Sequence, residues 1–194
     1  MAVFLPAQNE DDASTYSVAI YLTGANIAMG SPNPLPLPFD AGVRFANITI
    51  SKKSTILSAK VTFQAYSAGA GETCKVRIKG EAADDPATFS TKANFDNRAK
   101  TTEYMDWTIP VWTIDTDYDS PDIKNIIQEI VDRPGWVRGN HLILFFPNNG
   151  STAYATRSPK AYDTSTTLCA RLTITYTVRV PRHGFVNFQN PGIC

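Results

Sequence analysis

The stretch DWTIPVWTIDTDYDSPDIKNIIQEIVDRPGWVRGNHLILFFP, residues 106–147, decides the fold of this chain. Isoleucines recur in it at the spacing of one helix face: Ile123, Ile126, Ile127 and Ile130. This spacing predicts an amphipathic helix. Ser120 is placed to cap the helix and Pro121 suits its first turn, while Arg133 and Pro134 end it.

The rest of the chain is patterned for β-strands. The run LILFF, residues 142–146, is apolar throughout and too short for a helix, which is typical of a buried strand. Apolar and polar side chains alternate from Leu57 to Ala65, as in a strand with one buried face. Similar strands are expected in segments 16–22, 74–80, 105–113 and 168–180. The strand expected at residues 105–113 contains Pro110, which predicts that this strand lies near a sheet edge or a bulge. A change of phase in residues 42–50 predicts a bulge near Ala46 and Asn47.

Irregular segments separate these strands. The longest candidates are residues 24–42, rich in proline and glycine, and residues 81–100 and 148–165. Long loops in compact domains often carry function. Seven or more antiparallel strands with such loops predict an all-β fold, a jelly-roll β-sandwich with one amphipathic α-helix. We expect the sandwich to span residues 15–181, between an extended N-terminal arm (1–14) that can join a sheet edge and a C-terminal tail (182–194).

Charge and composition exclude several function classes. Eighteen lysines and arginines balance eighteen aspartates and glutamates, so no net field favours nucleic acid or an anionic membrane. No window approaches the length of a membrane span, and MAVFLPAQNEDDAST lacks the basic and apolar regions of a secretory signal. We therefore expect a protein made in a host cytoplasm, with neither nucleic acid nor a membrane as partner.

The three cysteines, Cys74, Cys169 and Cys194, lack the spacing of a metal site. Cys74 shares the strand parity of Val76 and is expected in the core. Cys169 shares the parity of Arg171 and is expected to face solvent. A disulfide between Cys74 and Cys169 is therefore not expected.

An ordered series of segments carries a family resemblance. The segments are GVRFANITI (42–50), STILSAKVTFQA (54–65), CKVRIKGEAADDPATF (74–89), WTIPVW (107–112), SPDIKNIIQEIVDRPGW (120–136) and GNHLILFF (139–146). Over roughly residues 11–178 they resemble a jelly-roll module of the kind related to DNRLRE-type and carbohydrate-binding domains. The resemblance implies a non-catalytic sandwich that binds or adheres, often to glycans.

Three departures from the common setting of such modules favour a phage virion. The chain is a single domain that starts at Met1, it lacks an export signal, and it carries the tail PRHGFVNFQNPGIC (181–194). The first interpretation is therefore a non-catalytic structural protein of a virion, a capsid decoration or a tail component. It would assemble through its terminal arms with itself, as a homo-oligomer, and with other virion proteins. The arm residues singled out for these contacts are Phe4, Leu5, Phe185 and Phe188.

The alternative is a carbohydrate-binding module for a cell-surface or biomass polysaccharide. Exposed aromatic rings would stack on sugars in such a module, and the candidates on or beside loops are Trp112, Tyr118, Tyr154 and Tyr162. Tryptophans of a small sandwich also fill the ends of its core. We prefer that interpretation for Trp107 and Trp136.

Signals for catalysis and metal binding are weak. Asp115, Asp117 and Asp119 alternate and are candidate ligands of a structural calcium ion, but helix capping and a solvated loop are the preferred account of these aspartates, and no cofactor is expected. An EF-hand loop starting at Asp115 would require glycine and glutamate where Ser120 and Ile126 stand, so that motif is absent. Only two histidines occur, and there is no nucleophile elbow or metal-binding histidine pair. We expect no enzyme activity.

Overall fold

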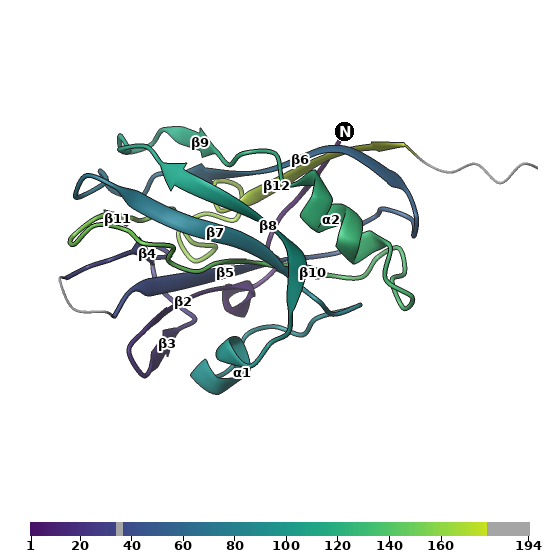
Figure 1. The fold of residues 1–194 in the computed structure, drawn as a ribbon, viewed down its shortest axis with the longest axis horizontal. Helices are drawn as coiled ribbons and strands as arrows, with labels where there is room; N and C mark the ends of the chain where they lie inside the picture. The colour runs from purple at the N-terminus through teal and green to yellow at the C-terminus, as the bar shows by residue number, and fades with distance from the viewer. Residues whose placement is uncertain (34–36, 178–194) are drawn as a thin grey trace, which may run out of the picture.

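The computed structural model describes residues 1–33 and 37–177, which fold as two antiparallel sheets packed face to face (Figure 1). The smaller sheet has four strands in the order β1-β12-β6-β9. Their bounds are Ala2–Phe4 (β1), Arg171–Thr177 (β12), Thr55–Gln64 (β6) and Asp117–Asp119 (β9). The all-β sandwich predicted from the sequence is confirmed.

The larger sheet has eight strands. Six follow the order β11-β4-β5-β10-β7-β8, and β2 and β3 extend it beyond β5. The bounds are Thr156–Arg157 (β11), Met29–Gly30 (β4), Phe39–Phe45 (β5), Leu142–Phe146 (β10), Cys74–Glu81 (β7), Lys100–Ile109 (β8), Asp12–Tyr16 (β2) and Ala19–Tyr21 (β3). Most connections, such as β5 to β6, β6 to β7 and β8 to β9, cross between the sheets, as in a jelly roll.

One contiguous core fills the space between the sheets. Phe63 of β6 lies at its centre, 5.2 Å from the ring of Phe146 and 6.3 Å from that of Trp107. Trp107 and Trp136 are buried in this core, as expected, and the indole N–H of Trp136 donates to the Ile50 carbonyl at 3.0 Å.

The amphipathic helix is present as α2, Lys124–Val131, and buries its isoleucine face against β6, β7 and β8. Its start differs from the prediction. The side chain of Ser120 does not cap α2: its hydroxyl accepts from the Val61 N–H and donates to the Pro121 carbonyl. The backbone of β6 competes for this side chain, so the helix begins at Lys124.

Polar side chains of α2 cover strand backbone that would otherwise be open. Glu129 accepts from the N–H groups of Thr102 and Glu103 on β8, at 2.9 and 2.8 Å. Because β8 ends the order of the larger sheet, this carboxylate blocks part of an exposed edge. The edge position predicted from Pro110 is confirmed.

A short helix, α1 (Lys92–Asp96), lies in the segment expected to be loop. The Thr91 hydroxyl caps it by accepting from the Asn94 N–H at 3.1 Å. Phe89 and Phe95 from this region pack on Phe145 and form a second apolar cluster on the outer face of the larger sheet. Five residues are too few to show a helical period in the sequence.

The N-terminal arm predicted for residues 1–14 is part of the sandwich. β1 pairs with β12 at the edge of the smaller sheet, as expected of an arm that joins a sheet edge, while Phe4 is buried in the core and β2 already begins at Asp12. Phe4 is therefore a core residue rather than an assembly contact, and Leu5 is half-buried beside it. The tail 182–194, with Phe185 and Phe188, lies outside the described residues.

Three local predictions of side-chain direction are corrected. β5 ends at Phe45 without a bulge, and Asn47 takes a left-handed conformation (φ 50°) that resets the phase. On β6 the register with β12 shifts beside Leu57, which turns outward and leaves Ile56 buried. Cys169 precedes β12 and is buried, like Cys74, and both thiols are free.

Within residues 1–33 and 37–177, no helix has the length and hydrophobicity needed to cross a bilayer.

Candidate functional site

The two sheets differ in width, and the difference leaves part of one inner face uncovered. Tyr16 of β2 pairs with Phe39 of β5, and Ser14 pairs with both Ala41 and Tyr21. Ala41 belongs to the core, so these side chains share its face of the sheet. The space over this face is lined on its other side by residues of segment 23–33, which also contains β4 of the same sheet, and none of the described lining residues comes from the smaller sheet.

A groove of about 610 Å³ results between this face and segment 23–33. Three aromatic rings line it. Tyr16 and Phe39 are in tilted contact with ring centroids 5.1 Å apart, and the Tyr21 side chain is 51% exposed. The volume of the groove falls within the range of about 300–1,000 Å³ found for ligand pockets.

Uncharged polar groups stand beside the rings. The Asn33 amide donates to the Tyr16 hydroxyl at 2.6 Å, which leaves the hydroxyl proton of Tyr16 to be donated elsewhere. The Asn26 amide donates to the Ile27 carbonyl at 3.3 Å, and its Oδ1 is an acceptor. The groove therefore offers apolar ring faces together with donors and acceptors that carry no charge.

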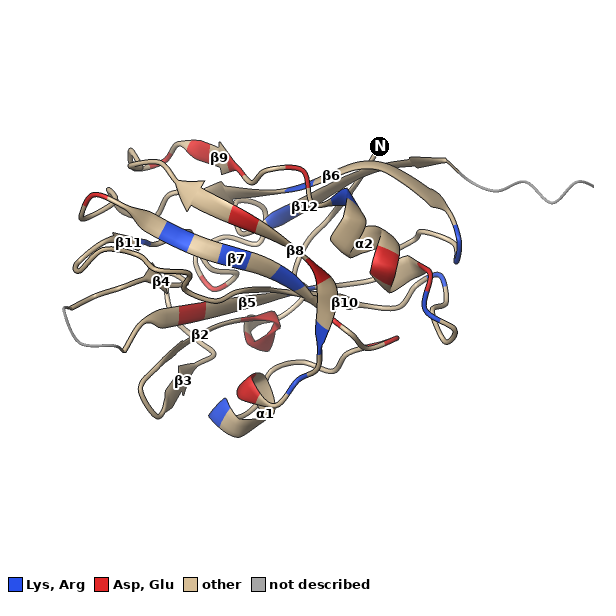
Figure 2. Cartoon of the chain, viewed as in Figure 1, with Lys and Arg blue, Asp and Glu red and all other residues tan. Residues whose placement is uncertain are grey.

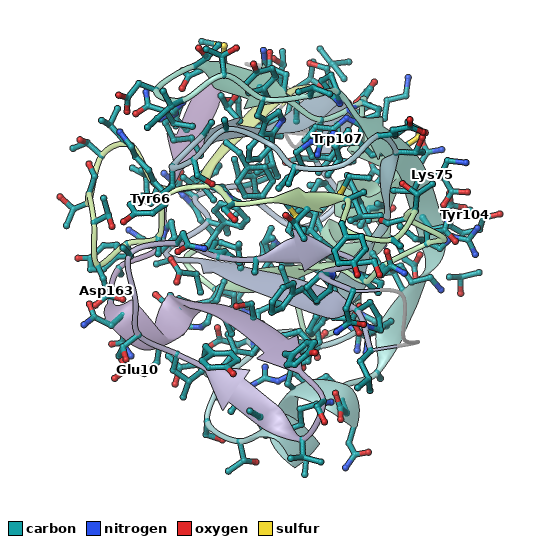
Figure 3. All side chains as sticks on the ribbon, turned by 90° about the vertical axis from the view of Figure 1, so that its left-hand side faces the viewer. Glu10, Tyr66, Lys75, Tyr104, Trp107 and Asp163 are labelled. Carbon is teal, nitrogen blue, oxygen red and sulfur yellow. The ribbon has the colours of Figure 1, made fainter. Side chains whose placement is uncertain are left out.

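Residues 161–164 hold the wall of the groove in place. The Gly24 N–H donates to Asp163 at 3.1 Å, and the Ala25 carbonyl accepts from the Ala161 N–H at 3.2 Å and from the Thr164 hydroxyl at 2.6 Å. Figure 3 faces the left-hand end of the Figure 1 view and labels Asp163. The wall is thus tied to a segment far away in sequence.

A buried carboxyl lies behind this wall. Asp12 of β2 is 4% exposed and accepts from the Tyr162 N–H at 2.7 Å. Burial raises the pKa of Asp12 to about 7, and the negative charges of Asp163 and Asp11 act in the same direction. Asp12 also contributes, after burial, to raising the pKa of the Cys169 thiol to about 11. At 4% exposure Asp12 is a structural group, with little surface to offer a ligand.

The aromatic residues predicted to bind glycans do not form one site. Trp112 is 2% exposed and stacks on Tyr118 with centroids 5.2 Å apart, so the prediction of an accessible ring at Trp112 is wrong. The Tyr118 hydroxyl accepts from the Thr113 N–H and braces that loop. Tyr154 is 59% exposed on its own loop, and Tyr162 is half-buried beside Asp12.

The three aspartates considered as candidate calcium ligands each have a different basic partner. The ion pairs are Asp115 with Lys160 (2.6 Å), Asp117 with Arg171 (2.6 Å) and Asp119 with Lys60 (2.5 Å). No group of three acidic, histidine or cysteine side chains in the described residues is arranged to hold a metal ion. The three carboxylates considered as calcium ligands are therefore dispersed among separate cations.

Sequence reasoning missed Tyr16, Tyr21 and Phe39 as site residues. The sequence predicts one strand over residues 16–22, with Tyr16 on its buried face and Tyr21 on the other. That prediction is wrong, because a turn at residues 17–18 separates β2 from β3 and the hairpin brings Tyr21 to the face of Tyr16. The length and composition of segment 24–42 were the available signal, because part of that segment lines the groove.

No family model matches this chain, and no curated protein matches it either. The function is therefore argued from the chemistry of the groove.

Proposed function

We propose that this protein is a non-catalytic carbohydrate-binding module and that the groove over β2, β3 and β5 is its binding surface. The observation that supports this proposal is the exposure of aromatic rings on a sheet face that is buried elsewhere. A sugar presents an apolar face of C–H groups that packs on such rings. Its hydroxyls pair with amide and hydroxyl side chains such as those of Asn26 and Tyr16.

The lining of the groove favours binding over hydrolysis. Glycosidases place two carboxyl groups on either side of the scissile bond. Among the described residues that line the groove there is no aspartate, glutamate or histidine. The groove can therefore hold a sugar, but these residues supply no acid–base pair to cleave it.

Replacing Tyr21 is expected to weaken glycan binding strongly. Its ring is the most exposed of the three, so Tyr21→Ala removes the main stacking surface while disturbing the core little. We expect a loss of affinity of about tenfold or more, which corresponds to about 1.4 kcal/mol or more. Affinity electrophoresis in gels containing a panel of polysaccharides, followed by titration calorimetry with the best one, measures this change.

Tyr154→Ala is the matched control for this experiment. Tyr154 is as exposed as Tyr21 but lies outside the groove, and it is also the exposed ring among the sequence-predicted glycan residues. We expect Tyr154→Ala to bind like the wild-type protein. Binding that is lost with Tyr154→Ala and retained with Tyr21→Ala would contradict the proposed surface.

A role in a phage virion is the second candidate, and the open edge at β1 favours it. β1 ends the order of the smaller sheet, and in the described residues no strand pairs with its other side. Such an edge can pair with a strand of another chain. In this proposal the sandwich is a capsid decoration or tail component that presents the groove outward.

Removing residues 183–194 is expected to abolish self-assembly if this second candidate is right. The full chain would then form a defined oligomer by light scattering, and the shortened chain would be a monomer with unchanged circular dichroism. These residues lie outside the described part, so their role is a prediction from sequence. A monomer in both preparations would contradict assembly through the tail.

A further inference from the structure

We infer that the groove selects neutral glycans and rejects acidic ones; this inference rests on the proposed function. Eleven described residues line the groove, and none has a lysine, arginine, histidine, aspartate or glutamate side chain. An acidic sugar would bring a carboxylate or sulfate into a site without a counter-ion. Removing such a charge from water without a partner is costly.

An acidic side chain stands at the rim of the groove. The Asp163 carboxylate binds the Gly24 N–H at the rim, and Asp12 lies behind the same wall. A bound anion would be repelled by the Asp163 carboxylate.

The nearest lysine along the wall is turned away from the groove. Lys160 forms a backbone bridge with Asn26, but its Nζ binds Gln64 at 2.7 Å and Asp115 at 2.6 Å. Lys160 is thus already neutralised by a carboxylate and does not line the groove.

Cations gather instead on a different face of the molecule. Lys75, Arg77 and Lys79 alternate along the outer face of β7, where they form the basic stripe visible in Figure 2. Arg77 is paired with Asp106 at 2.7 Å and lies over the Tyr104 ring. Figure 3 shows Lys75 on the opposite border of the molecule from Asp163. An acidic polymer would be drawn to this stripe, away from the groove.

The hydrogen-bonding groups of the groove match sugar hydroxyls. The Tyr16 hydroxyl, which accepts from Asn33, can donate a hydrogen bond to a sugar hydroxyl, and the Asn26 Oδ1 can accept one. Each of these groups pairs with a neutral hydroxyl without any change of charge. Affinity for the ligand should therefore depend little on ionic strength.

Matched neutral and acidic polymers test the inference. We would measure binding to polygalacturonate and its methyl ester, to carboxymethyl and hydroxyethyl cellulose, and to neutral galactomannan and mixed-linkage glucan. A Lys75→Ala/Lys79→Ala double variant is used throughout, so that the basic stripe does not contribute. We expect at least one neutral polymer to bind, and any acidic counterpart to bind about tenfold more weakly. The neutral affinity should change by less than about twofold between about 20 and 300 mM NaCl.

Two results would overturn the inference, and they differ in meaning. Equal or tighter binding of an acidic counterpart, lost with Tyr21→Ala and weakened by salt, would leave a glycan-binding groove but contradict its neutral selectivity. Absence of binding to every polymer would contradict the proposed function itself, and the selectivity with it.

Discussion

Arg157→Met is expected to lower the free energy of unfolding by about 3–5 kcal/mol. Arg157 is 0% exposed, and its guanidinium donates to backbone carbonyls rather than to an acid. It reaches Pro110 at 2.6 Å, Ala70 at 2.8 Å and Ile109 at 3.4 Å. One side chain thereby fastens three chain segments at the same end of the sandwich.

The partners of Arg157 explain why the loss should be large. A buried ion pair can be replaced by two apolar side chains, but backbone carbonyls cannot be mutated away. Methionine fills a similar volume but removes hydrogen bonds from a charged donor, worth about 1.5–3 kcal/mol each. It leaves the Pro110 carbonyl without its donor, whereas the Ala70 carbonyl keeps the Thr156 N–H. Burial lowers the pKa of Arg157, yet a guanidinium stays protonated.

Urea unfolding followed by tryptophan fluorescence measures this effect. Arg138→Met is the matched control, because Arg138 is exposed, and should change stability by less than about 0.5 kcal/mol. If Arg157→Met does not accumulate as a folded protein, Arg157→Lys replaces it. Lysine keeps the charge but loses the fork of guanidinium donors, so the free energy of unfolding of Arg157→Lys should be lower than that of wild type but higher than that expected for Arg157→Met. Wild-type stability in both Arg157 variants would contradict this account.

Asp12→Asn is expected to stabilise the protein at alkaline pH and to have much less effect under acidic conditions. In the unfolded chain the Asp12 carboxyl loses its proton near its ordinary pKa of 3.8, whereas in the folded protein burial raises that pKa to about 7. Between these values the folded state binds more protons, so wild-type stability falls as the pH rises. Above the folded pKa the loss is complete.

The size of this effect follows from the pKa of Asp12. Each tenfold change in proton affinity is worth about 1.4 kcal/mol, so the loss is on the order of 4 kcal/mol across the window. Asparagine does not ionise, and its Oδ1 can still accept from the Tyr162 N–H. The advantage of Asp12→Asn over wild type should therefore grow from about pH 4 to about pH 7 and stay constant above it.

Unfolding titrations at several pH values between these limits check the prediction. The exposed Glu72→Gln serves as the control, with an expected change of less than about 0.5 kcal/mol. A stability difference between Asp12→Asn and wild type that is the same at every pH would show that Asp12 does not retain a proton in the folded state.

The fold could be predicted from the sequence where a pattern is long and repeated. The isoleucine stripe of α2 and the uninterrupted apolar run of β10 each allow one interpretation. Local departures from these patterns could not be predicted from the sequence in the same way. The outward turn of Leu57 depends on its register with β12, and the start of α2 depends on Ser120 binding the backbone of β6. Both are contacts between segments distant in sequence.

The candidate site was harder to predict than the fold, because exposure of an aromatic ring is a tertiary property. Trp112 stands beside a loop in the sequence but is covered by Tyr118. Tyr16 and Tyr21 stand in a strand-like segment, and they are uncovered only because the larger sheet extends beyond the smaller one. The widths of two sheets cannot be read from alternation in any single strand.

Amide chemical-shift mapping during titration with a neutral oligosaccharide tests the central claim most directly. The oligosaccharide is prepared from whichever neutral polymer retards the protein in gels. We predict that the shifts concentrate at residues 14–16, 21–28, 33 and 39, which line or border the groove. Shifts centred on Tyr154 or on the basic stripe of β7, with the groove unaffected, would contradict it.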